Sequence, residues 1–127
     1  MPPFLYIFNF LGVDSMNTYV TITVNCPSDT AILCAHNTLL SFDKIEASYL
    51  KENIHTTYAR IKYPVPTHGS KVSIACLVTA QASANNFCTV TLTANVVHTS
   101  GLLVGSTHEF AAEFLSRFSE AIENTGI

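Results

Sequence analysis

The stretch Thr38-Leu39-Leu40-Ser41-Phe42-Asp43-Lys44-Ile45-Glu46-Ala47-Ser48-Tyr49-Leu50 decides the fold that the sequence predicts. On a helical wheel its apolar side chains share one arc, and most of its polar side chains lie opposite. The apolar arc holds Leu39, Phe42, Ile45, Tyr49, Leu50 and the following Ile54. This spacing predicts a single amphipathic helix of about four turns.

Glu46 is an exception to this separation of apolar and polar side chains, because it falls near the middle of the apolar arc. A carboxylate directed at a core needs a hydrogen-bonding partner, a solvated pocket or a chemical role. Glu46 is therefore the first candidate for a catalytic residue. A structural carboxylate is the alternative, and Asp43, close by on the same arc, is the other candidate acid.

Strand patterns dominate the rest of the chain. Residues 17–25 alternate between apolar and polar side chains, as expected of a half-buried strand. Four further strands are predicted over 56–63, 71–82, 87–98 and 102–113, and a helical tail over 114–122. A strand, a helix and an antiparallel meander predict an α+β hot-dog fold, in which the sheet wraps round one central helix. A cystatin-like cone and a helix-grip fold are the alternatives, although the sequence shows neither the several early helices of the former nor the long final helix of the latter.

Length and composition limit the classes of function. The 127 residues are enough for one domain, and 48% of them are hydrophobic while 12% are charged. Such low charge favours a homodimer, or a dimer of dimers, with part of the surface covered. A net charge of −3 with six Lys and Arg argues against nucleic acid as a partner.

The four cysteines and five histidines form no metal-binding motif. The cysteines have no C-x-x-C spacing, so free thiols in a reducing compartment are expected, and the location is predicted to be cytoplasmic. The histidines show neither H-x-x-x-H nor H-E-x-x-H spacing, so no metal is proposed.

Residues 1–15 are treated as an N-terminal leader, and residues 16–127 as the single hot-dog domain. The apolar run from Phe4 to Phe10 is too short to span a bilayer and has no basic residue before it, so no membrane association is expected. The leader is either an extra strand, a segment packed across a dimer, or an extension ahead of a true start at Met16.

Several short motifs resemble the fluoroacetyl-CoA thioesterase-like group of hot-dog proteins. The run 104–110, with its His108-Glu109 pair, followed by Arg117-Phe118, is similar to the group's G-x-G-x-H-E-R and R-F segments. Thr38 and Glu46 match the spacing of its T-x7-E helix motif, and residues 28–31 resemble its early D-T-A segment.

The resemblance implies that Thr38 and Glu46 are catalytic. It also implies a histidine on the strand after the helix, but Lys62 stands at that position and His68 lies six residues further on. His68 is therefore an assisting candidate, while Lys62, Asp43 and His108 are candidates for substrate binding. Considered without the resemblance, Thr38 is expected to be the N-cap residue of a helix. His108 is then expected to be a hydrogen-bonded histidine on a strand.

The sequence thus predicts an acyl-CoA thioesterase-like hydrolase that binds a small or medium acyl thioester. Coenzyme A would enter only as part of the substrate, and no other cofactor is expected. The alternative is a catalytically degenerate hot-dog module that binds acyl-CoA or another hydrophobic ligand without turnover, which the absent strand histidine favours. A hot-dog dehydratase is a weaker third hypothesis, because no D-x4-H motif is present.

Overall fold

A computed structural model describes residues 9–13, 17–65, 70–97 and 106–124. Its elements, in chain order, are β1 (Asn9–Val13), β2 (Asn17–Val24), α1 (Ser28–Leu40), β3 (Ile45–Lys51), the 3-10 turn η1 (Glu52–Ile54), β4 (Thr56–Val65), β5 (Ser70–Ala82), the 3-10 turn η2 (Ala84–Asn86), β6 (Cys88–Val96) and α2 (Ser106–Glu123).

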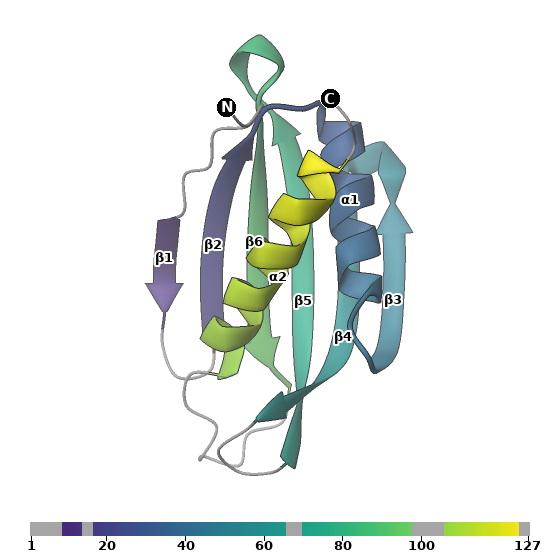
Figure 1. Cartoon of the computed structure of the whole chain (residues 1–127), viewed down its shortest axis with the longest axis vertical. Coiled ribbons are helices and arrows are strands. Elements are labelled where there is room, and N and C mark those ends of the chain that lie inside the picture. The colour runs from purple at the N-terminus through teal and green to yellow at the C-terminus, as the bar shows by residue number, and fades with distance from the viewer. Residues whose placement is uncertain (1–8, 14–16, 66–69, 98–105, 125–127) are drawn as a thin grey trace.

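The strands form one antiparallel sheet in the order β1-β2-β6-β5-β4-β3. Both helices lie on the same face of this sheet, α2 over its middle and α1 beside it (Figure 1). The molecule therefore has two layers, and the opposite face of the sheet has no helix over it among the described residues.

The alternation in β5 and β6 explains which face the helices cover. In β6 the buried residues Cys88, Val90, Leu92, Ala94 and Val96 alternate with the partly exposed Thr89, Thr91 and Thr93. The β-branched and apolar side chains favour the pleated strand, and the period of two directs one set to the helices and the other to the opposite face. The four strands predicted over 17–25, 56–63, 71–82 and 87–98 are confirmed as β2, β4, β5 and β6.

α2 supplies the largest side chains of the core. Phe110, Phe114, Phe118 and Ile122 are fully buried. They recur every four residues, so they share one face of the helix, which lies on the sheet. Burying one such side chain stabilises the fold by about 1.5–3 kcal/mol relative to leaving it exposed.

α1 packs with smaller side chains. Ala31, Ile32, Ala35 and Leu39 are buried at helical spacing. The helix ends where the Ser41 hydroxyl donates a hydrogen bond to the carbonyl of Thr38 at 2.6 Å. A serine that bonds to nearby backbone in this way competes with the helical ladder, which is consistent with the helix ending there.

Two polar contacts, one buried and one partly buried, tie the helices to the sheet. The hydroxyls of Thr18 in β2 and Thr107 in α2 hydrogen-bond each other at 2.8 Å. His36 Nδ1 in α1 lies 2.8 Å from the Thr57 hydroxyl in β4. Each contact satisfies a polar group that would otherwise be costly to bury.

The hot-dog prediction is wrong. Only the first residues of the predicted helix lie in α1, and residues 45–51 form β3 at the edge of the sheet. The strand predicted over 102–113 is also wrong from Ser106 onward, where α2 begins. Two helices on one sheet face replace the single central helix.

α2 is also the long final helix that the sequence analysis found missing for a helix-grip fold. It has 18 residues and lies across the sheet, and β2 pairs with the last strand, β6. The layout therefore resembles the helix-grip alternative more than the predicted hot-dog fold. Within the described residues no helix has the length and apolar character to cross a membrane.

Candidate functional site

Glu46 lies on β3 and not on a helix. Its side chain accepts a hydrogen bond from the Ser73 hydroxyl at 2.8 Å and lies 3.6 Å from Arg60 Nε. Arg60 and Ser73 alternate with the core residues of β4 and β5, so these contacts are on the face away from the helices. The predicted core-directed position of Glu46 is therefore wrong.

Thr38 lies in the last turn of α1, where it is buried. Its hydroxyl donates to the carbonyl of Cys34 at 2.7 Å, so it does not cap the start of a helix. Thr38 and Glu46 thus lie on different elements. His108 is exposed in the first turn of α2, and His68 lies outside the described residues.

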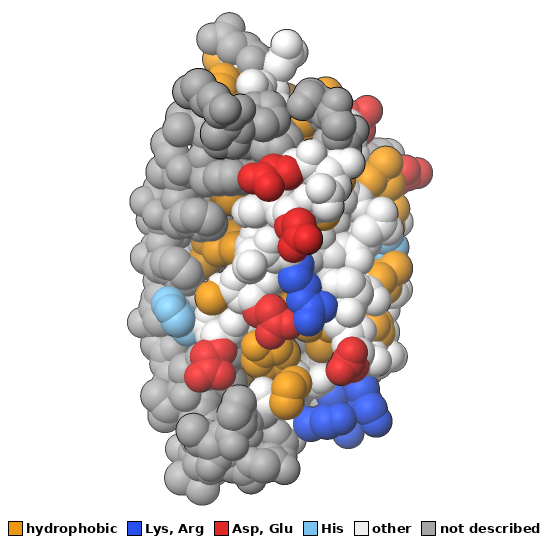
Figure 2. Space-filling model, viewed as in Figure 1, with side chains coloured by type: hydrophobic (Ala, Val, Ile, Leu, Met, Phe, Trp, Pro, Cys, Tyr) orange, Lys and Arg blue, Asp and Glu red, His pale blue; other side chains and the backbone are white. Residues whose placement is uncertain are grey.

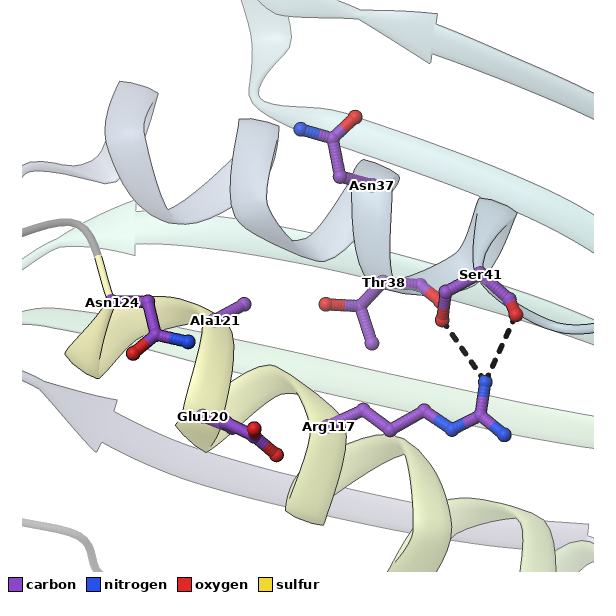
Figure 3. Close-up of a pocket in the computed structure, with 7 residues that line it drawn as sticks. All are labelled: Asn37, Thr38, Ser41, Arg117, Glu120, Ala121 and Asn124. Atoms are coloured by element: carbon purple, nitrogen blue, oxygen red, sulfur yellow. Dashed lines mark hydrogen bonds between the residues drawn. The ribbon is translucent and has the colours of Figure 1, made fainter.

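A groove lies between α1 and α2, and Thr38 is among the residues that line it. Its volume is about 370 Å³. It is lined by Asn37, Thr38, Ser41, Arg117, Glu120, Ala121 and Asn124 (Figure 3). We call this cavity the interhelical groove.

Arg117 closes one end of the interhelical groove. Its guanidinium donates to the Ser41 carbonyl at 3.0 Å and to the Ser41 hydroxyl at 3.1 Å, as the dashed lines in Figure 3 show. It also forms an ion pair with Glu113, one helical turn away, and lies 4.1 Å from the ring centroid of Phe42. Arg117 therefore links α2 to the end of α1.

A smaller pocket of about 70 Å³ lies on the other side of Arg117. It is lined by Phe42, Asp43, Lys62, Tyr63, Pro64, Glu113 and Arg117. The predicted candidates Asp43 and Lys62 therefore meet here, and Thr38 lies across Arg117 in the interhelical groove. The Tyr63 hydroxyl donates to Glu113 at 2.8 Å, and burial together with this carboxylate raises the pKa of Tyr63 above its ordinary value.

Three polar side chains of the interhelical groove have unused hydrogen-bonding capacity. Among the described residues, the side chains of Asn37, Glu120 and Asn124 contact no hydrogen-bonding partner. Together they offer carboxylate and amide oxygens as acceptors and two amide groups as donors. The described lining holds no thiol and no imidazole, and the hydroxyls of Thr38 and Ser41 both donate to backbone carbonyls of α1.

The sequence analysis missed Glu113, Glu120 and Asn124 as site residues and used Arg117 only within a motif. Glu113 and Arg117 stand four residues apart, the spacing of a helical ion pair, and this signal was available once a helix was assigned there. The contact between Arg117 and Ser41 spans 76 residues of sequence and has no local signal.

The four cysteines are free thiols, as predicted. Cys26, Cys76 and Cys88 are buried, and Cys34 is partly exposed. Among the described residues, no three or more His, Cys, Asp or Glu side chains gather in a way that would hold a metal ion.

No protein-family model matches the chain, and no curated protein matches it. A solved structure that matches is described as a START superfamily protein from Mycobacterium smegmatis. It is 9% identical, with a TM-score of 0.46, over 87% of this chain and 96% of that one.

The assignment to the fluoroacetyl-CoA thioesterase-like group is corrected by these findings. That group has the hot-dog fold, whereas two helices pack on one face of the sheet in this protein (Figure 1), and no family model matches the chain. Thr38 and Glu46, which carried the helix motif, lie on α1 and β3.

Proposed function

We propose that the protein is a small-molecule binding module that does not turn its ligand over, and that the ligand lies in the interhelical groove. The observation that carries the proposal is a groove of about 370 Å³ lined by three polar side chains that have no hydrogen-bonding partner within the described part of the chain. This volume falls in the range of small-molecule sites, which combine a few convergent polar groups with apolar walls.

The lining favours an amphipathic ligand with a hydrogen-bond donor, such as an amine. Glu120 offers an unpaired carboxylate, whereas the guanidinium of Arg117 is already engaged by Glu113 and Ser41. A phosphate-rich ligand such as acyl-CoA would face this carboxylate without a free cation to bind it. Ala121 gives the ligand's apolar part a surface on which to pack.

Binding without turnover is supported by the chemistry of the described lining. Hydrolysis of a thioester needs a nucleophile or an activated water and a group that moves a proton. Glu120 is exposed, and no partner holds its carboxylate in a fixed position. Its surroundings therefore favour contact with a ligand over proton transfer.

The test uses hexylamine and hexanoate as matched probes, with 15N-labelled protein observed by NMR. Hexylamine should shift the side-chain amide signals of Asn37 and Asn124 at millimolar concentration, and hexanoate should shift them less. Ala121→Trp fills the groove and should abolish the effect. Ala112→Trp, at an exposed position of the same helix, is the matched control.

Two results would contradict the proposal. Shifts that survive in Ala121→Trp would place the probe elsewhere, and release of free thiol from a panel of acyl-CoAs would show turnover. We expect thiol release at the rate of the protein-free control.

A further inference from the structure

The sheet face without helices carries a row of side chains, one from each of five strands, of which four are large: three tyrosines and a leucine. The register aligns Tyr19, Thr93, Leu77, Tyr58 and Tyr49, in that order, from β2 to β3. Tyr19, Leu77 and Tyr49 are 39%, 37% and 41% exposed, and they are three of the six large apolar side chains with substantial exposure among the described residues. Half of that set therefore lies in one line, which we call the tyrosine row.

Basic side chains flank the tyrosine row at its β3 end. Lys51 on β3 and Arg60 on β4 each lie two residues along the strand from a tyrosine of the row, whereas Lys71 lies on the same face but six residues from Leu77 along β5. Glu46, paired with Arg60, is the carboxylate on this face among the described residues.

The carboxylates gather in the other layer. Figure 2 shows the helix face, where several acidic side chains are spread along the length of the molecule and basic side chains form one central group and another at the lower right. The acidic side chains on α2 are Glu109, Glu113, Glu120 and Glu123. The net charge of −3 is thus the sum of two unlike parts: an acidic helix layer, and a sheet face that carries more cations than anions among the described residues.

The tyrosines and the cations are in direct contact. The rings of Tyr49 and Tyr58 stack, with centroids 5.2 Å apart and an interplanar angle of 17°. Lys51 Nζ lies 5.1 Å from the centroid of the Tyr49 ring. A ligand at this end of the row would meet π faces and a positive charge together.

We propose that the tyrosine row binds single-stranded RNA. Bases stack on aromatic rings, cations hold phosphates, and the hydroxyl of Thr93, which lies between Tyr19 and Leu77 in the row, can bond a 2′-hydroxyl. Four strand spacings of about 4.8 Å make the row about 19 Å long, enough for a few nucleotides.

Fluorescence anisotropy with a labelled 12-nucleotide RNA of mixed pyrimidines tests this proposal. Loss of one stacking ring should weaken binding by roughly 5- to 100-fold in Tyr49→Ala and Tyr19→Ala. Tyr49→Phe should bind like the wild type, because it keeps the ring. Lys51→Gln should weaken binding several-fold and reduce the salt dependence by about one unit of logarithmic slope.

Matched controls lie in the helix layer and before β3. Leu40→Ala removes a side chain that is 42% exposed on α1, and Lys44→Gln removes a lysine outside the row. Both should bind RNA as the wild type does, and circular dichroism checks that every variant is folded.

The proposal fails if Leu40→Ala weakens binding as much as Tyr49→Ala, or if no RNA binds at 50 mM salt and 100 µM protein. Equal affinity for DNA of the same sequence would contradict the role of the 2′-hydroxyls, and equal affinity for heparin would contradict the role of stacking. A concentration-dependent dimer that Tyr49→Ala dissolves would assign the row to a second copy instead. The groove variant Ala121→Trp should leave RNA binding unchanged, so the two proposals can fail separately.

Discussion

Replacement of Phe114 by alanine tests whether the space between α2 and the sheet is filled by side chains. Phe114 is fully buried and stacks on Phe118, with ring centroids 5.6 Å apart and an interplanar angle of 11°. Truncation of such a side chain removes its transfer free energy and leaves a cavity, which together cost about 3–5 kcal/mol. Loss of the aromatic pair is part of this cost.

The assay is urea denaturation followed by circular dichroism. The free energy of unfolding should fall by about 4 kcal/mol in Phe114→Ala, with an unchanged m-value. For a domain of this size, the same change lowers the Tm by roughly 12–16 °C. Leu40→Ala, at an exposed position of α1, should change stability by no more than about 0.5 kcal/mol.

A cost below about 1.5 kcal/mol for Phe114→Ala would refute this reasoning, because it would show that the interior collapses or was loosely filled. Benzene provides a second measurement. A dry apolar cavity binds benzene, so the variant should be stabilised by it and the wild type should not. Stabilisation of the wild type by benzene would place an apolar ligand site between α2 and the sheet rather than in the interhelical groove.

Three further predictions concern the groove, the smaller pocket and the thiols. Arg117→Met removes the bonds to Ser41, the ion pair and the ring contact, and because the guanidinium is partly exposed the loss should be about 1–1.5 kcal/mol in urea denaturation. The raised pKa of Tyr63 means that its hydroxyl keeps its proton more tightly in the folded state than in the unfolded state. Its contribution to the free energy of unfolding is therefore complete below about pH 10 and declines as the pH rises further. In Tyr63→Phe, the free energy of unfolding from urea curves should therefore fall less between pH 8 and pH 11 than it does in the wild type. A thiol reagent should label Cys34 before the three buried cysteines, slowly because burial raises its pKa, and Cys34→Ser should remove this first phase.

The central strands could be predicted because their side chains carry the pattern of the sheet. In β6, apolar residues alternate with threonine and asparagine over all 9 positions, and in β5 the same alternation is interrupted by Ala75 and Leu77 on the face away from the helices. One face of each strand is buried by the helices and the other is not, so sequence alternation and burial coincide. For such a strand, the sequence alone is enough to predict which side chains are buried.

α1 and β3 could not be predicted in the same way. The buried face of α1 includes Ala31, Ala35 and Thr38, which are too small or too polar to mark a hydrophobic stripe. β3 is partly or fully exposed along its length, so its sequence does not show the alternation of apolar and polar residues that would predict a strand. Its conformation depends on pairing with β4, a contact between segments that the local pattern does not contain.

The site prediction for Glu46 followed from the helix prediction and failed with it. A helical wheel with a period of 3.6 placed Glu46 among apolar residues, whereas the pleat of β3 and its irregular register next to Ile45 direct it to Ser73 and Arg60. Thr38, Asp43 and Lys62 do lie around one region, but they line two cavities separated by Arg117. Since that arrangement depends on α2 crossing the end of α1, the residue that organises the region can be found only from the packing of two helices far apart in the sequence.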